Sequence, residues 1–168
     1  MGRLTRLLKH RLWDEADARR ALPPATLDRL QALVVASEAR HSGEIRICVE
    51  ASLPLSYLWR HAPVRQRAIA MFGKLRVWDT EHNNGVLIYL LLAERRIEVV
   101  ADRAIDARVA PATWTAMVDS LRTALRSGGF ENGLSAAIRT ADEMLVAHFA
   151  LAAGVKRLNE LPDAVVLL

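Results

Sequence analysis

Two neighbouring apolar runs in the middle of the chain constrain its fold more than any other feature. The first run spans residues 86–92 and the second spans residues 97–101, with the charged segment Ala93-Glu94-Arg95 between them. Apolar runs of this length joined by a short charged turn are typical of adjacent buried β-strands. We therefore predict a β-hairpin in the interior of a sheet.

The rest of the chain has the periodicity of helices arranged around one further strand. Residues 44–51 alternate between apolar and polar side chains, which predicts a strand with one face covered less completely than the other. Apolar residues at helical spacing predict helices over residues 3 to about 20, 26–41, 63–75, 111–126 and 132–149. In the helix at 63–75, the outer face is expected to carry Arg65, Arg67 and Lys74.

This order of elements predicts an α/β fold with a small mixed sheet and helices on both of its faces, an αβα sandwich. A parallel crossover would join the first two strands, and the hairpin would add an antiparallel third strand. We divide the chain into an N-terminal amphipathic helix (1–24), a main domain (25–150) and a C-terminal tail (151–168) that docks on the domain.

Polar side chains lie at those strand ends that this topology brings together. With the first two strands parallel and the third running back, two strand starts and one strand end share a single rim of the sheet. The residues of this rim cluster are His41 and Glu44 before the first strand, Asp79, Glu81, His82, Asn83 and Asn84 before the second, and Asp102 and Arg103 after the third.

Four residues of the rim cluster carry the oxygen ligands that Ca²⁺ or Mg²⁺ prefers: Glu44, Asp79, Asn84 and Asp102. A magnesium-type site would activate water against a phosphate ester, and Arg103 would hold the anion. The remaining rim residues, His41, Glu81, His82 and Asn83, would complete an anion-binding or polar cluster around it.

The same residues also allow a purely structural interpretation. Asp102 would then pair with Arg103, Asn84 and Gly85 would form a turn, and His41 would cap its helix. The spacing contains no Ser-His-Asp, Cys-His or glycine-rich phosphate motif, so no catalytic residue is assigned. The sequence alone leaves both interpretations open.

Composition restricts the partners and the compartment. The net charge of +4 permits an anionic partner, but no nucleic-acid-binding module is present, so we expect no nucleic-acid binding. The single cysteine, Cys48, is expected to be a buried apolar residue in a reducing compartment. No apolar signal segment precedes the domain, and the longest charge-free stretch near the C-terminus, 144–155, is too short to span a bilayer. We therefore expect a soluble, cytoplasmic protein.

The N-terminal helix is amphipathic and basic. Its apolar stripe consists of Leu4, Leu7, Leu8, Leu12 and Ala16. We expect these leucines to dock on the rest of the chain. The alternative is that the helix rests on a membrane surface or on a protein partner.

Several segments resemble the TPM domain family, which is named for proteins of the thylakoid lumen, photosystem II repair and receptor modulation. The similar segments are Asn84-Gly85-Val86-Leu87-Ile88, Arg95-Arg96-Ile97-Glu98-Val99, Asp102-Arg103-Ala104-Ile105 and Phe130-Glu131-Asn132-Gly133-Leu134. His41-x-Gly43-Glu44 and Asn159-Glu160-Leu161-Pro162-Asp163 resemble a small bacterial branch of soluble members. Secreted and lumenal members usually have a glycine-rich turn where this chain has Asp102-Arg103-Ala104, so their cation ligands are not transferred.

The resemblance implies the αβα sandwich and two possible functions. The best-known relatives act on membrane complexes, which implies a non-catalytic binding or assembly module with membrane-associated partners. Membrane-anchored TPM proteins and LemA-like proteins are the partners that it suggests. Some relatives are described as acid phosphatases, so the alternative is a weak phosphatase that depends on a divalent cation.

Overall fold

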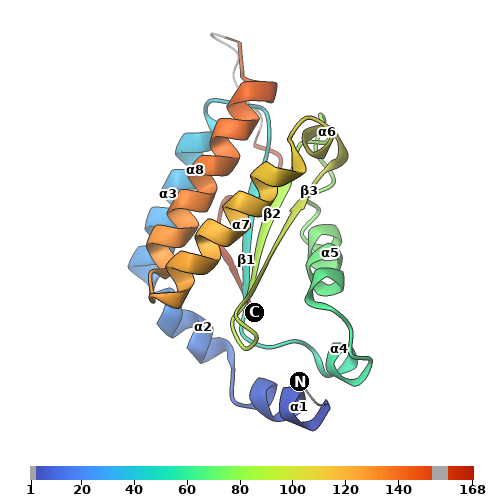
Figure 1. Cartoon of the computed structure of the whole chain (residues 1–168). Helices are drawn as coiled ribbons and strands as arrows, with labels where there is room; N and C mark the ends of the chain where they lie inside the picture. Colours follow the sequence, from blue (N-terminus) through green and yellow to red (C-terminus); the bar gives the residue numbers. More distant parts are fainter. Residues whose placement is uncertain (1–2, 153–158) are drawn as a thin grey trace.

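The computed structural model describes residues 3–152 and 159–168, and in it helices flank both faces of one sheet (Figure 1). The helices are α1 (Arg3–Arg11), α2 (Glu15–Ala21), α3 (Pro24–Glu38), α4 (Leu55–Trp59), α5 (Val64–Lys74), α6 (Arg103–Asp106), α7 (Pro111–Arg126) and α8 (Phe130–Phe149). The strands are β1 (Ile45–Glu50), β2 (Val86–Leu91), β3 (Arg96–Ala101) and β4 (Val166–Leu167).

The sheet has the order β3-β2-β1-β4. β1 and β2 run parallel, with Ile45 opposite Val86, and β3 returns antiparallel to β2. This arrangement confirms the predicted mixed sheet, its parallel crossover and its hairpin. The short strand β4, from the C-terminal segment, pairs in parallel with β1.

The two faces of the sheet are covered by different helices. α3, α7 and α8 pack on one face, and α5 packs on the other (Figure 1). Side chains alternate accordingly, since Ile47 and Ile88 belong to the core under α3, α7 and α8, whereas Cys48 and Tyr89 belong to the core under α5. Strand periodicity thus divides one sheet between two apolar cores.

β1 is buried along its whole length, so the expectation of a less covered face was wrong. Arg46 and Glu50, which alternation assigned to the polar face, are each at most 5% exposed. Arg67 of α5 is also buried, although we expected it on the outer face of its helix. Its guanidinium donates to both carboxylate oxygens of Glu50, at 2.6 and 2.9 Å. The pairing explains the burial, because a charged side chain enters a core only with a partner.

The N-terminal segment forms two helices where we expected one. Asp14 caps α2 by accepting from the Asp17 N–H at 3.2 Å, and the Asp17 carboxylate accepts from the Asp14 N–H in return. This reciprocal capping box starts a new helix and separates α2 from α1.

In the N-terminal segment Leu7 packs against the core under α5, as expected, but the expected docking was wrong for Leu8 and Leu12. These two side chains are 65% and 80% exposed, while Arg6 and His10 are buried. Glu94 in the hairpin turn accepts from Arg6 Nε at 2.5 Å and from His10 Nε2 at 2.9 Å. The hairpin therefore holds α1 through charge-assisted hydrogen bonds.

No helix in residues 3–152 or 159–168 combines the length and the apolar character that a bilayer crossing requires.

Candidate functional site

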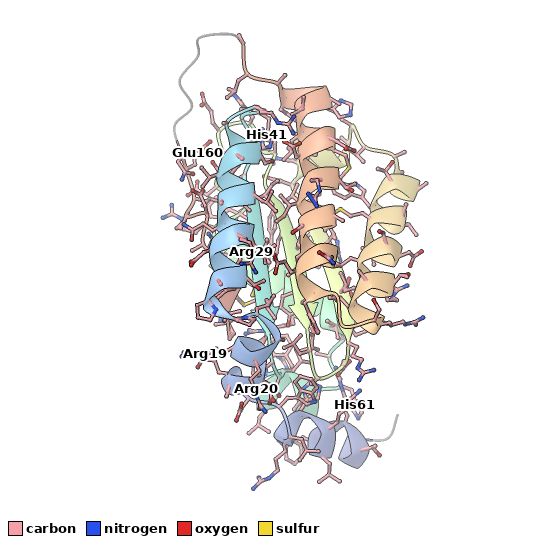
Figure 2. All side chains as sticks on the ribbon, turned by 90° about the vertical axis from the view of Figure 1, so that its left-hand side faces the viewer. Arg19, Arg20, Arg29, His41, His61 and Glu160 are labelled. Atoms are coloured by element: carbon pink, nitrogen blue, oxygen red, sulfur yellow. The ribbon has the colours of Figure 1, made fainter. Side chains whose placement is uncertain are left out.

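Three separate segments meet at one rim of the sheet. The Val86 N–H donates to the Glu44 carbonyl at 2.8 Å, and the Asp102 N–H donates to the Gly85 carbonyl at 2.8 Å. The Ala104 N–H donates to the Asn83 carbonyl at 3.0 Å. Figure 2 shows His41 and Glu160 at this end of the molecule, with His61 at the other end. The structure thus brings the starts of β1 and β2 beside the end of β3, as the parallel crossover requires.

Asn84 lies at the centre of this rim and is fully buried. Its backbone N–H donates to Thr80 Oγ1 at 3.1 Å, and its side-chain Nδ2 donates to Ser42 Oγ at 3.1 Å. Its Oδ1 atom is buried and has no hydrogen-bond partner among the described residues. A buried amide oxygen without a donor carries a desolvation cost of about 1–3 kcal/mol, which a bound ligand would remove.

Asp102 contributes a second such oxygen. Its Oδ1 accepts from the Arg103 N–H at 2.7 Å and caps α6, whereas its Oδ2 is buried and has no partner in the described part of the chain. The Arg103 guanidinium donates to Asn83 Oδ1, at 2.7 and 3.0 Å. Asn83 has a φ of 50°, a left-handed conformation that asparagine tolerates better than most residues. The Arg103 guanidinium is thus held by the neutral side-chain amide of Asn83.

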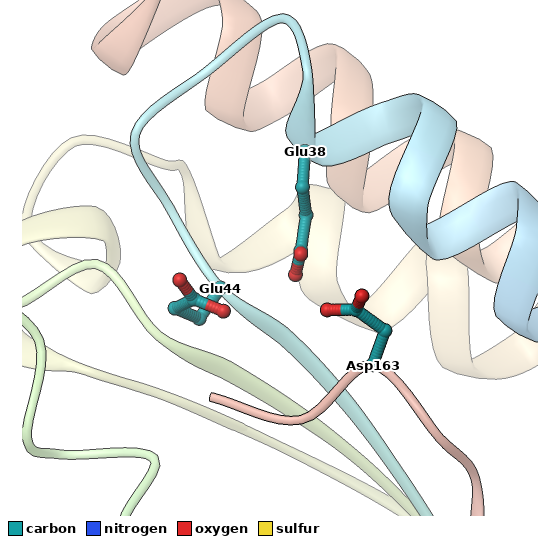
Figure 3. A group of neighbouring side chains, drawn as sticks. All are labelled: Glu38, Glu44 and Asp163. Carbon is teal, nitrogen blue, oxygen red and sulfur yellow. The ribbon is translucent and has the colours of Figure 1, made fainter. Parts of the chain in front are cut away.

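Glu44 belongs to a different group of carboxylates. One oxygen from each of Glu38, Glu44 and Asp163 lies within 4.8 Å of the others (Figure 3). Glu38 Oε1 accepts from the Ile45 N–H at 2.8 Å, and Glu44 Oε1 accepts from the Glu160 N–H at 3.1 Å. Burial lowers the pKa of the neighbouring Arg46, and the charges of Glu38 and Asp163 oppose that shift. Arg46 therefore supplies a cation to this acidic group.

Asp79, Glu81 and His82 lie at the periphery of the rim. Asp79 forms an ion pair with Arg76, and the backbone N–H of Glu81 donates to Glu160 Oε2 at 2.9 Å. His82 is exposed and lines a shallow hollow of about 370 Å³ together with Ser42 and Arg108. Of the predicted metal ligands, Asn84 and Asp102 thus lie on backbone segments that meet at the rim, while Glu44 and Asp79 make other contacts.

His41 forms a buried network between α3 and α8. Its Nδ1 accepts from the Gly43 N–H at 3.2 Å, which leaves Nε2 to donate to Ser37 Oγ at 2.9 Å. Ser37 Oγ in turn donates to Asp142 Oδ1 at 2.9 Å. The three residue types match a catalytic triad, but the imidazole donates to the hydroxyl and does not accept its proton, so it does not activate a nucleophile here. This network joins the two helices.

Gly85 fixes the distance between the rim and the preceding loop. A Cβ atom at this position would lie 2.1 Å from the Val77 carbonyl oxygen. Only glycine permits this approach of the two backbones, which holds the 77–84 loop against the start of β2.

A model of the TPM domain matches residues 16–144, which is most of the chain. The chain belongs to the TPM domain family. Among solved structures, the TPM fold described above is similar to the NMR structure of BA42 protein from the psychrophilic bacterium Bizionia argentinensis, with a TM-score of 0.75 and 24% identity. The alignment covers 86% of this chain and 94% of BA42, and at that identity it shows the fold alone. No curated protein matches the chain.

Several segments described above lie outside the part of the chain that matches the TPM domain. α1 precedes it, and Glu160, Asp163 and β4 follow it. Sequence reasoning missed Ser42, although its position directly after His41 was a usable signal. It also missed Ser37 and Asp142, because their contact joins positions 105 residues apart and no local pattern predicts it.

Proposed function

We propose that this TPM domain is a non-catalytic binding or assembly module that acts with membrane-associated partners. The observation that supports the proposal is a set of exposed apolar side chains, here called the apolar patch: Leu8 of α1, Leu12 directly after α1, and Leu55 and Trp59 of α4. Each of these side chains is at least 63% exposed, and the two helices contact each other at one end of the molecule (Figure 1). Large exposed apolar side chains gathered on neighbouring elements indicate a surface that a partner covers.

The charges around the apolar patch favour a partner with an acidic surface. Lys9 and Arg11 lie between the two leucines in the sequence, and Arg60 directly follows Trp59 at the end of α4. The acidic side chains of the adjacent α2 are largely neutralised, because Glu15 pairs with Arg19 and Asp17 pairs with Arg20. The excess of basic groups at this end would speed the encounter with an acidic partner and orient it.

The test measures binding of the purified chain to detergent-solubilised candidates from the same genome, a membrane-anchored TPM protein and a LemA-like protein. The double substitution Leu8→Glu and Leu12→Glu places two charges in the apolar patch. We expect it to weaken binding at least about tenfold, since burying a leucine side chain contributes about 1.5–3 kcal/mol.

A matched control uses an apolar side chain that is exposed elsewhere. Ile69 on α5 is 52% exposed and lies outside the apolar patch, so Ile69→Glu is expected to leave binding unchanged. An equal loss of affinity in both variants, or no binding of either candidate by the native chain, would remove the support for this proposal.

A divalent-cation-dependent phosphatase is the second candidate, and the two partnerless buried oxygens favour it. Asn84 Oδ1 and Asp102 Oδ2 are amide and carboxylate oxygens, the ligand types that Ca²⁺ and Mg²⁺ prefer. Arg103, Arg108 and His82 would supply cationic or donor groups for a phosphate beside them. In this proposal Asn84 and Asp102 hold the ion, and Glu44 and Asp79 contribute less than the sequence predicted.

A thermal melt with millimolar CaCl₂ or MgCl₂ tests the cation site first. An ion that binds only the native state stabilises it by about 2.7 kcal/mol at a concentration of a hundred times Kd. Asp102→Asn retains a good helix cap but removes the charge, so it should abolish the increase in Tm. Asp106→Asn, on the same short helix, is the matched control.

Hydrolysis of p-nitrophenyl phosphate with and without MgCl₂ then tests catalysis. We expect turnover that requires the metal and is lost in Asp102→Asn. Ion binding without turnover would support a cation site and reject the phosphatase. Turnover that survives in Asp102→Asn would reject this assignment of residues.

A further inference from the structure

A cavity of about 640 Å³ lies at the opposite end of the molecule from the rim. It is bounded by the β2–β3 hairpin, by Trp13 between α1 and α2, and by the C-terminal turn of α7 with the start of α8. Its volume falls within the range of small-molecule sites, about 300–1,000 Å³. None of its lining residues belongs to the rim cluster or to the apolar patch.

The walls of this hairpin cavity are largely apolar. Leu92 and Ile97 come from the hairpin, and Leu125 and Phe130 come from α7 and α8. Trp13, which is half-buried, closes one side. Such a lining accepts an alkyl or aryl group, with a gain of about 0.8 kcal/mol for each methylene removed from water.

Four arginines also line the hairpin cavity: Arg95, Arg96, Arg122 and Arg126. Two of them already face carboxylates, because Arg122 pairs with Asp119 at 2.5 Å and Arg96 lies 3.8 Å from Glu98. Arg95 and Arg126 form no ion pair with any described residue.

The acidic residue of the hairpin cavity does not neutralise these arginines. Glu94 accepts hydrogen bonds from Arg6 and His10 on α1. Burial alone would raise the pKa of Glu94, but the hydrogen bonds from His10 and Arg6 outweigh burial and hold it below its ordinary value. Its charge is therefore matched by α1, which leaves a positive excess at the cavity.

We propose that the hairpin cavity binds an amphipathic anion, a molecule with one carboxylate head and an alkyl chain. The carboxylate would pair with Arg95 and Arg126, since guanidinium groups bind carboxylates with two parallel hydrogen bonds. The alkyl chain would lie against Trp13, Leu125 and Phe130. The cavity combines an apolar wall with an excess of positive charge, and an amphipathic carboxylate is complementary to both features.

Isothermal titration calorimetry with three probes tests the proposal on the full chain. Decanoate, used below its micelle concentration, carries both features, acetate carries only the charge, and decanol carries only the chain. We expect decanoate to bind at least about tenfold more tightly than decanol, since a hydrogen bond to a charged group contributes about that factor. We expect it to bind at least about tenfold more tightly than acetate, since burial of two methylenes already contributes about that factor. Equal binding of decanol and decanoate, or of acetate and decanoate, would overturn it.

Two substitutions locate the site. Arg126→Gln and Arg95→Gln should each weaken decanoate binding about tenfold, whereas Arg139→Gln, on the exposed face of α8, should not change it. Decanoate should also shift the amide resonances of residues 95–97 and 125–130 in ¹H–¹⁵N spectra. Shifts confined to the rim or to the apolar patch, or an equal effect of Arg139→Gln, would reject the hairpin cavity as the site.

Discussion

Single residues in this TPM domain show how charged side chains become part of a core. Glu50 on β1 and Arg67 on α5 are both buried and joined by three hydrogen bonds, and the Tyr89 hydroxyl donates to the same carboxylate. Arg67 also lies over the Tyr57 ring, 5.3 Å from its centroid. Burial and the nearby Glu50 carboxylate together raise the pKa of Cys48 to about 12, so that thiol remains protonated in the native state.

Removal of one partner from this buried pair should be costly. Arg67→Met leaves the Glu50 carboxylate buried without its cation, and we expect a loss of about 3–5 kcal/mol in the free energy of unfolding. The double variant Arg67→Met with Glu50→Leu should recover much of that loss, because no charge then remains in the core.

Urea denaturation of the two variants checks this prediction. Lys74→Met on the same helix is the control, because Lys74 is exposed and its replacement should change stability by at most about 0.5 kcal/mol. A loss of similar size in the Arg67 and Lys74 variants would contradict a structural role for the pair.

Among the helical elements, α3 and α8 are joined by ionic contacts as well as by apolar packing. Glu131 in the first turn of α8 accepts from Arg29 of α3 at 2.6 and 2.7 Å and from Thr26 at 3.0 Å. These hydrogen bonds lower the pKa of Glu131 from 4.5 to about 2, and the bond from Arg29 contributes the most. The folded state therefore holds the Glu131 carboxylate in its charged form more strongly than the unfolded state does.

This lowered pKa sets a pH dependence of stability. The contribution of Glu131 is fully present above about pH 4.5 and is lost as the pH falls through the folded-state pKa of about 2. Native protein should thus be more stable than Glu131→Gln at pH 6, and the difference should shrink between pH 4.5 and pH 2. Urea unfolding across that range measures it, with Glu143→Gln, an exposed position on α8, as the control. A difference that is constant with pH would contradict the pKa.

Sequence patterns predicted those elements whose periodicity is local. The hairpin, the parallel crossover and the meeting of the backbone segments that carry Asn84 and Asp102 all followed from apolar runs and the handedness of crossovers. The orientation of α1 did not, because its leucine stripe suggested an inner face, whereas the ion pairs of Arg6 and His10 with the distant Glu94 decide it. Arg67 was missed for the same reason, since its partner Glu50 lies on another element. The grouping of Glu38 with Asp163 depends on a contact between segments far apart in the sequence.

At the scale of the whole molecule, the polar rim lies at one end of the sheet, and the hairpin that lines the cavity lies at the other. Figure 1 shows α1 and α4 at the hairpin end. The central strands β1 and β2 connect the two ends and are buried on both faces. α1 lies at the edge of the molecule, where Arg6 and His10 bond to Glu94 and to the 52–62 segment. Its local stability should therefore be lower than that of the sheet.

Hydrogen exchange measures this difference directly. Amides of β2 should exchange only through global unfolding, whereas those of α1 should exchange faster through local opening. Glu94→Gln should accelerate exchange in α1 about tenfold and leave β2 unchanged, because it removes the charge that holds Arg6 and His10. Glu98→Gln, in the same hairpin, should affect neither segment. Equal acceleration in α1 and β2 would show that α1 unfolds together with the domain.

The contact between Gly85 and Val77 has a consequence for how this chain tolerates mutation. A Cβ at position 85 would meet the Val77 carbonyl oxygen, so even alanine would displace the loop that carries Asp79, His82 and Asn83. A coding change at this codon would therefore alter several polar groups at once, although it replaces none of them. The path of the loop backbone thus depends on a position that has no side chain at all.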